Sequence, residues 1–139
     1  MKVSLKALLN KILTTINTMQ TTLTSLALYK SGTGTITCTT GGVKTNITYV
    51  QKGYVVQTSG AVKATASISS GGNLAAGTIK GIPTPVGGVR TVSYYGDNAC
   101  VSYMGTAGNF NVRNCGDDAL AKDSDAALCW VYITNGNML

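Results

Sequence analysis

The 139-residue sequence contains no histidine and no glutamate, and aspartate supplies all of its acidic residues. Without histidine, a Ser-His-Asp or Cys-His relay and a histidine-ligated metal site are excluded. Any carboxylate chemistry would rest on Asp97, Asp117, Asp118, Asp123 and Asp125. Threonine and glycine are abundant instead, and such a composition suits assembly and contact better than catalysis. We therefore expect a protein that is not an enzyme.

Close cysteine pairs are also missing. Cys38, Cys100, Cys115 and Cys129 are separated by 62, 15 and 14 residues, so none forms the CxxC pair of a structural zinc site. Three disulfide pairings are possible, but a chain of this length does not need disulfides, and we expect reduced cysteines that pack in the interior. The aspartates between residues 117 and 125 lack the spacing of an EF-hand loop, so we predict no metal and no cofactor.

Long hydrophobic runs are absent from the N-terminus. Asn10, Lys11, Thr14 and Thr15 interrupt its apolar residues. We therefore expect neither a signal peptide nor insertion into a membrane.

A heptad pattern occupies the N-terminal segment, which contains no proline and no glycine before Gly32. Its apolar positions alternate in steps of four and three residues, as in a coiled coil. They are Leu5, Leu9, Ile12, Ile16, Met19, Leu23 and Leu26. Isoleucine occurs at both a and d positions, and Leu8 and Leu13 widen the apolar face, which favours more than two helices. We predict a homotrimeric coiled coil; the alternative is an amphipathic helix packed on its own domain.

After Gly32 the pattern changes to the two-residue alternation of β-strands. We predict strands over residues 33–40, 43–50, 54–58, 61–69, 78–82, 89–95, 99–104, 109–114 and 128–134. Turns are expected at residues 51–53 and at Ser59-Gly60, and residues 115–127 are expected to form an exposed loop. Pro83 and Pro85 exclude their segment from the centre of a sheet. The chain should form a helical stalk (residues 1–30) and a mainly β knob (residues 31–139), an antiparallel sandwich resembling a jelly roll.

The last predicted strand is apolar on both faces. Leu128, Trp130 and Tyr132 share one face, and Cys129, Val131 and Ile133 share the other. We expect this strand to lie inside the sheet, with the core on one side and a neighbouring subunit on the other.

Positive charge is unevenly distributed along the chain. Residues 1–96 carry nine Lys or Arg and no acid, whereas residues 97–139 carry Arg113 and Lys122 against five aspartates. The lysines are scattered singly instead of forming a stripe with interleaved aromatic residues, so we expect no nucleic-acid partner. We interpret the pattern as a basic stalk that docks onto a larger particle and a less basic tip.

Four segments carry the local matches to a known family: a hairpin with a polar or basic residue, a glycine, valines and a second glycine, then a segment of small residues and proline, then two closing strands. They are residues 51–60 (QKGYVVQTSG), 76–85 (AGTIKGIPTP), 110–114 (FNVRN) and 130–134 (WVYIT). Together with the stalk, they resemble bacteriophage fibre proteins of the tail-fibre, baseplate receptor-binding or head-fibre type. The resemblance covers roughly residues 50–134. It implies a trimeric virion protein, made in the cytoplasm of a bacterial host, whose knob binds host-surface glycans or proteins.

Two other hypotheses remain open. One is a structural head fibre or capsid decoration protein, anchored to other virion proteins by its N-terminal helix. The other is a hydrolytic enzyme on a β scaffold, which would need Asp117 and Asp118 as its paired carboxylates.

The candidate ligand-binding residues lie in the C-terminal part of the chain. They are Tyr94, Tyr95, Asp97, Asn98 and Tyr103. Aromatic rings with a polar edge suit sugar faces, and aspartate and asparagine accept hydrogen bonds from hydroxyls. The alternative is that most of the aromatic residues belong to the core, since a sandwich needs large side chains between its sheets. Tyr94 and Tyr95 are adjacent, so they should point to opposite faces of their strand.

Overall fold

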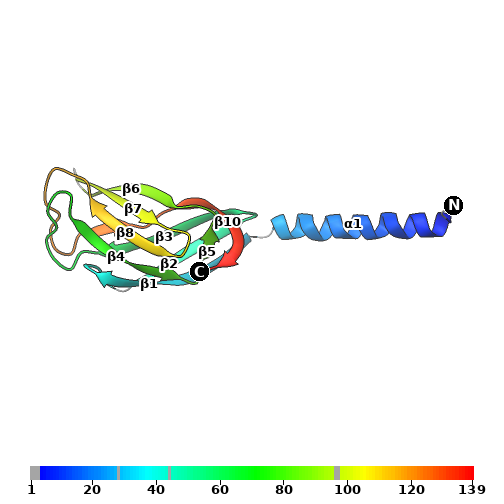
Figure 1. The fold of residues 1–139 in the computed structure, drawn as a ribbon, viewed down its shortest axis with the longest axis horizontal. Coiled ribbons are helices and arrows are strands. Elements are labelled where there is room, and N and C mark those ends of the chain that lie inside the picture. Colours follow the sequence, from blue (N-terminus) through cyan, green and yellow to red (C-terminus); the bar gives the residue numbers. More distant parts are fainter. Residues whose placement is uncertain (1–3, 28, 44, 96–97) are drawn as a thin grey trace.

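The computed structural model describes residues 4–27, 29–43, 45–95 and 98–139, and Figure 1 shows a long helix extending from one end of an elongated β domain. The described elements in chain order are α1 (Leu5–Ala27), β1 (Tyr29–Thr40), β2 (Thr45–Lys52), β3 (Val55–Lys63), β4 (Asn73–Lys80), β5 (Pro83–Pro85), β6 (Val89–Tyr95), β7 (Asn98–Met104), β8 (Asn109–Asn114), β9 (Asp125–Ala127) and β10 (Val131–Met138). The predicted class, mainly antiparallel β structure with one N-terminal helix, is confirmed.

Helix α1 begins at a serine cap. The Ser4 hydroxyl accepts a hydrogen bond from the backbone N–H of Ala7 at 3.2 Å, and the Ser4 carbonyl accepts one from the N–H of Leu8 at 3.1 Å. A serine at this position satisfies an N–H group that has no partner within the helix. The helix then continues for 23 residues, because no glycine or proline interrupts it. Strand β1 begins at Tyr29, so a single residue separates the helix from the sheet.

The described strands form one antiparallel sheet in the order β5-β10-β3-β2-β1-β4-β8-β7-β6. β9 pairs with the second half of β3, and β10 pairs with the first half. The sheet curls, so that β6 and β7 lie against β9. The indole N–H of Trp130 donates to the carbonyl of Ser102 on β7 at 3.4 Å, and this hydrogen bond connects the two facing sides of the curled sheet. β5, with its two prolines, lies at one end of the strand order, as the missing N–H donors require.

The core lies inside this curl. Every second residue of most strands points inwards, as the pleat of a strand dictates. Fully buried aliphatic side chains come from β1, β2, β3, β4 and β8: Ile36, Ile47, Val56, Val62, Leu74, Ile79 and Val112. Strands far apart in the sequence therefore contribute to one continuous core.

The alternation predicted for the last strand is confirmed. Leu128, Trp130 and Tyr132 are buried, whereas Val131 and Ile133 are exposed. β10 lies between β5 and β3, so its predicted place inside the sheet is also confirmed.

The predicted turn at Ser59-Gly60 is wrong. β3 continues without interruption from Val55 to Lys63, with Ser59 opposite Thr48 and Gly60 opposite Ile47. A Cβ atom at Gly60 would lie 3.1 Å from the Ile47 side chain, tighter than ordinary packing contact. Close approach of β2 therefore accounts for this glycine, in place of a turn.

The prediction that residues 115–127 form an exposed loop is wrong in part. Leu120, Ser124 and Ala126 are buried, and Asp125–Ala127 forms β9. Ile68 and Leu120 exchange two backbone hydrogen bonds, each 2.8 Å long. Small and apolar residues between the aspartates thus enter the core, while the carboxylates stay at the surface.

Candidate functional site

The apolar seam of helix α1 is exposed to solvent. Its described members are Leu5, Leu9, Ile12, Ile16, Met19 and Leu23, each between 46% and 72% exposed. The side chain of Leu26, the seventh predicted seam residue, lies outside the described residues. Because the helix extends away from the β domain (Figure 1), the alternative of a helix packed on its own domain does not describe this structure.

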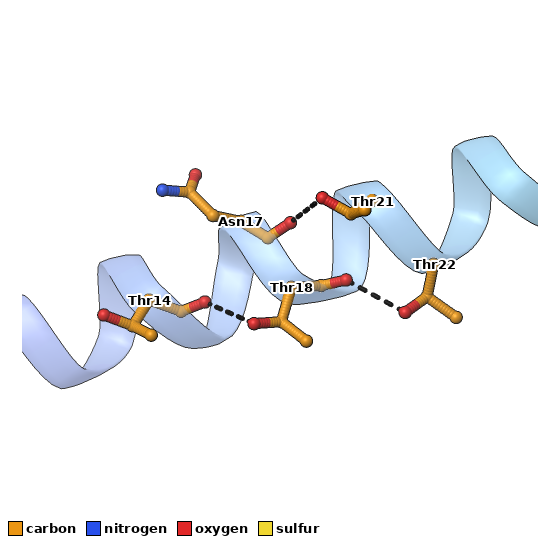
Figure 2. Close-up of a pocket in the computed structure, with 5 residues that line it drawn as sticks. All are labelled: Thr14, Asn17, Thr18, Thr21 and Thr22. Atoms are coloured by element: carbon orange, nitrogen blue, oxygen red, sulfur yellow. Dashed lines mark hydrogen bonds between the residues drawn. The ribbon is translucent and has the colours of Figure 1, made fainter.

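The polar side of α1 carries no charged residue from Thr14 to Thr22, the part of the helix drawn in Figure 2. The hydroxyls of Thr18, Thr21 and Thr22 each donate to a backbone carbonyl one turn earlier, at 2.9, 3.0 and 3.0 Å. A shallow hollow on this side is lined by these threonines together with Thr14 and Asn17. Threonine is a weak helix former, and its hydroxyl competes for the helix's own carbonyls. The stability of the helix therefore depends on what its seam contacts.

The structure describes the predicted ligand-binding residues only in part, and it places the backbone of Tyr103 away from the others. Asp97 lies outside the described residues, and of Tyr94, Tyr95 and Asn98 only the backbone is described. Tyr95 pairs with Asn98 at one end of the β6–β7 hairpin. Tyr103 is five residues further along β7, roughly 16 Å away at the usual rise of a strand.

The ring of Tyr103 is already engaged within the β domain. The Arg90 guanidinium carbon lies 5.7 Å from the ring centroid, a cation–π distance. A Cβ atom at Gly88 would lie 2.8 Å from the same ring, so the ring packs directly against the Gly88 backbone. Tyr103 is half-buried and stabilises the contact between β6 and β7.

Two loops at the end of the β domain farthest from the helix meet at a buried asparagine. We call residues 64–72 and 115–124 the distal loops. The side-chain amide of Asn114 donates to the carbonyls of Asp118 at 2.8 Å, Ile68 at 3.2 Å and Ser69 at 3.3 Å. Its oxygen accepts the N–H of Gly116 at 3.1 Å. The fully buried Asn114 thus holds both loops in one arrangement, and no sequence pattern predicted this role.

The charge separation of the sequence is also a separation along the molecule (Figure 1). Lys30 and Lys52 lie at the end of the β domain nearest the helix, where the Lys52 ammonium lies 5.2 Å from the Tyr29 ring centroid. Asp117, Asp118 and Asp123 lie in the distal loops. The distal end is therefore less basic than the helix end.

Within the described ranges, no group of three or more His, Cys, Asp or Glu side chains gathers around a point where a metal could bind.

All four cysteines are described, and all are free. Cys100 is buried; its burial, with a smaller contribution from the nearby Cys115, raises the pKa of its thiol. Burial also raises the pKa of the half-buried Cys38. Cys115 and Cys129 are exposed, so the prediction of interior packing is wrong for these two. Cys129 lies between the inward-facing Leu128 and Trp130, and alternation directs it outwards.

Within the part of the chain that the structure describes, no helix is long and apolar enough to cross a membrane. Comparison of the chain with protein-family models, with curated proteins and with solved structures gives no match.

Proposed function

We propose that this chain is a non-enzymatic fibre protein of a bacteriophage virion, trimeric through its helix, whose β knob attaches the particle to the host surface. The observation that carries this proposal is the unburied heptad seam on a helix that extends from a β domain. An apolar stripe on an isolated helix is a burial surface without a partner. Three parallel copies of the same stripe bury one another most simply.

Energetic considerations support self-association of the helix. Each fully buried leucine or isoleucine gains about 1.5–3 kcal/mol over an exposed one. Six described seam residues on each of three helices would contribute such a gain. A threonine-rich helix of 23 residues is marginal alone in water, so association and helix formation should be coupled.

The β domain supports the attachment half of the proposal. In this proposal, the curled sheet is the jelly-roll-like sandwich of the knob. The distal loops, held by Asn114, present a preorganised polar surface at the end opposite the stalk. Preorganised loops bind with a smaller entropic cost than mobile ones. Neutral polar and acidic groups there suit the hydroxyls of a glycan or a polar protein surface.

Imaging of intact particles tests this function. Gold-labelled antibody against the full-length chain should mark the tail tip or baseplate, and labelled chain should bind saturably to intact host cells. Label at those positions without any binding to host cells would contradict the attachment role.

A second candidate is a structural head fibre or capsid decoration protein. Lys6 and Lys11 favour it, because they give the far half of the helix a positive charge that an acidic socket on a virion could receive. Deletion of residues 1–28 should then abolish incorporation into particles, and label should mark the head. Normal incorporation of the deleted chain would contradict this candidate.

A further inference from the structure

Exposed apolar side chains gather on the outer face of the sheet, at the end next to the helix. Ile133 on β10 pairs with Val55 on β3, and Val131 pairs with Gln57, whose partner on β2 is Val50. The backbones of Val86 and Tyr54 bond to Ile133 and Thr134 at 2.9 and 2.8 Å and extend the group. We call Val50, Tyr54, Val55, Val86, Val131 and Ile133 the basal patch; each is 46–67% exposed.

The same face changes character towards the distal end. Ser59 pairs with Thr48, and Thr48 pairs with Thr33; all three are exposed. In the next row, the exposed Asn46 pairs with the exposed Thr35. On β2 and β3, the large exposed apolar residues of this face thus lie in the rows nearest the helix, and small polar residues follow in the next two rows. Contact with solvent alone does not explain why the large apolar side chains of this face gather at its end next to the helix.

The short connection between helix and sheet restricts where the basal patch can lie in a trimer. One residue separates Ala27 from Tyr29, and successive Cα atoms are about 3.8 Å apart. Helices in a bundle pack with axes about 8–10 Å apart, so Tyr29 would lie within roughly 15 Å of the three-fold axis. Layers of sheet are about 10 Å apart, without counting their outer side chains. Three β domains that begin so close to a common axis meet at this end.

We infer that the basal patch is the surface on which neighbouring copies of this same chain pack, and that the trimer is held at the base of its knobs as well as in its stalk. This inference rests on the trimeric stalk of the proposed function. A hollow beside the patch, lined by Thr48, Val50, Gln57 and Ser59 among others, receives side chains of the neighbouring copy. The helix seam and the basal patch lie along the same three-fold axis, so together they form one continuous interface between the copies.

Dissociation of the full-length chain by dilution tests this inference. The variant Val131→Lys/Ile133→Lys places two charges on the patch, at side chains exposed enough to accept them in the monomer. Its matched control is Val43→Lys/Val92→Lys, which adds the same charge at exposed valines outside the patch. Analytical ultracentrifugation gives the concentration at which half of the chains are dissociated. Fluorescence of the buried Trp130, the single tryptophan, reports whether the β domain is folded.

The patch variant should need at least about a tenfold higher concentration to form trimers, the effect of losing one modest contact, while the control behaves as wild type. Equal dissociation of patch variant, control and wild type would overturn the basal interface and leave the trimeric stalk intact. A wild-type chain that is monomeric at every concentration would overturn both proposals. If the patch variant loses its Trp130 signal, Val131→Thr compared with Val92→Thr decides the question by the same measurement.

Discussion

Asn114 shows how one buried polar side chain can organise a surface. Its amide and carbonyl oxygen bond to four backbone groups in the two distal loops, and no part of it is exposed. Backbone carbonyls that lose such a donor while buried cost about 1–3 kcal/mol each. The shape of the distal end therefore depends on a residue that itself contacts no solvent.

Replacing Asn114 with alanine should lower the free energy of unfolding by about 2–4 kcal/mol, because buried carbonyls lose their donor and a cavity remains. Chemical denaturation followed by Trp130 fluorescence measures the loss. Asn46→Ala, at an exposed position on β2, is the control and should change stability by no more than about 0.5 kcal/mol. Equal effects at the two positions would show that Asn114 does not clamp the loops.

The buried Tyr132 makes the folded chain less stable at alkaline pH. Burial, with a smaller contribution from the nearby Tyr49, raises the pKa of Tyr132 above its ordinary value of 10.0, and its hydroxyl donates to the Pro83 carbonyl at 2.7 Å. The unfolded chain therefore releases this proton at a lower pH than the folded chain. The stability that Tyr132 contributes is complete below pH 10 and is lost as pH rises further.

The wild-type free energy of unfolding should accordingly decline above pH 10 with a Tyr132 component of up to about 1.4 kcal/mol per pH unit. Tyr132→Phe should be less stable at neutral pH, because the Pro83 carbonyl loses its donor, but its alkaline decline should be shallower. The slope that remains comes in part from Cys38 and Cys100, whose pKa values are also raised. Denaturant titrations from pH 7 to 11 measure both slopes, and identical slopes would contradict this role.

At the scale of elements, α1 has a seam whose six described side chains are largely exposed and a polar side rich in threonine. Packing, not intrinsic propensity, must hold such a helix together. The β domain, in contrast, has its own core and requires no contribution from the helix.

Ile16→Lys should therefore dissociate the trimer and reduce the helical circular dichroism signal, because a charge in the apolar seam opposes its burial. Thr18→Lys, on the polar side of the same helix, is the control and should preserve both. Trp130 fluorescence should not change in either variant, since the seam does not contact the β core. Retained helicity in a monomeric Ile16→Lys chain would contradict the coupling of folding and association.

Sequence patterns predicted those elements whose signal is local and periodic. The helix, β6 and β8 follow from regular spacing, and the two faces of the last strand follow from its alternation. Gly60 misled the prediction because its cause, contact with Ile47, comes from another strand. Asn114 gave no signal, because its partners Ile68 and Ser69 lie 46 and 45 residues earlier in the chain.

The candidate site was predicted only in part for the same reason. The helix seam is a periodic feature, so it could be predicted. Its exposure agrees with a predicted interface, and the trimer itself stays a prediction. The contacts of Tyr103 had no signal in the sequence, because Arg90 and Gly88 become its neighbours only through the pairing of β6 and β7. The basal patch likewise exists only once β2, β3 and β10 lie side by side.

In the whole molecule, helix α1 and the elongated β domain follow one another along a single axis (Figure 1), with the basal patch at the end of the β domain next to the helix and the distal loops at the other end. Apolar surface is exposed at the helix and at the base of the β domain, and polar surface dominates beyond it. This order fits a molecule that assembles at one end and makes contacts at the other.

The mass of the full-length chain in solution decides whether three copies associate. Sedimentation equilibrium at micromolar concentration should give three times the 14.3 kDa of one chain. A mass of 14.3 kDa at every concentration would contradict trimer formation, because the exposed seam and the basal patch would then have no second copy to cover them.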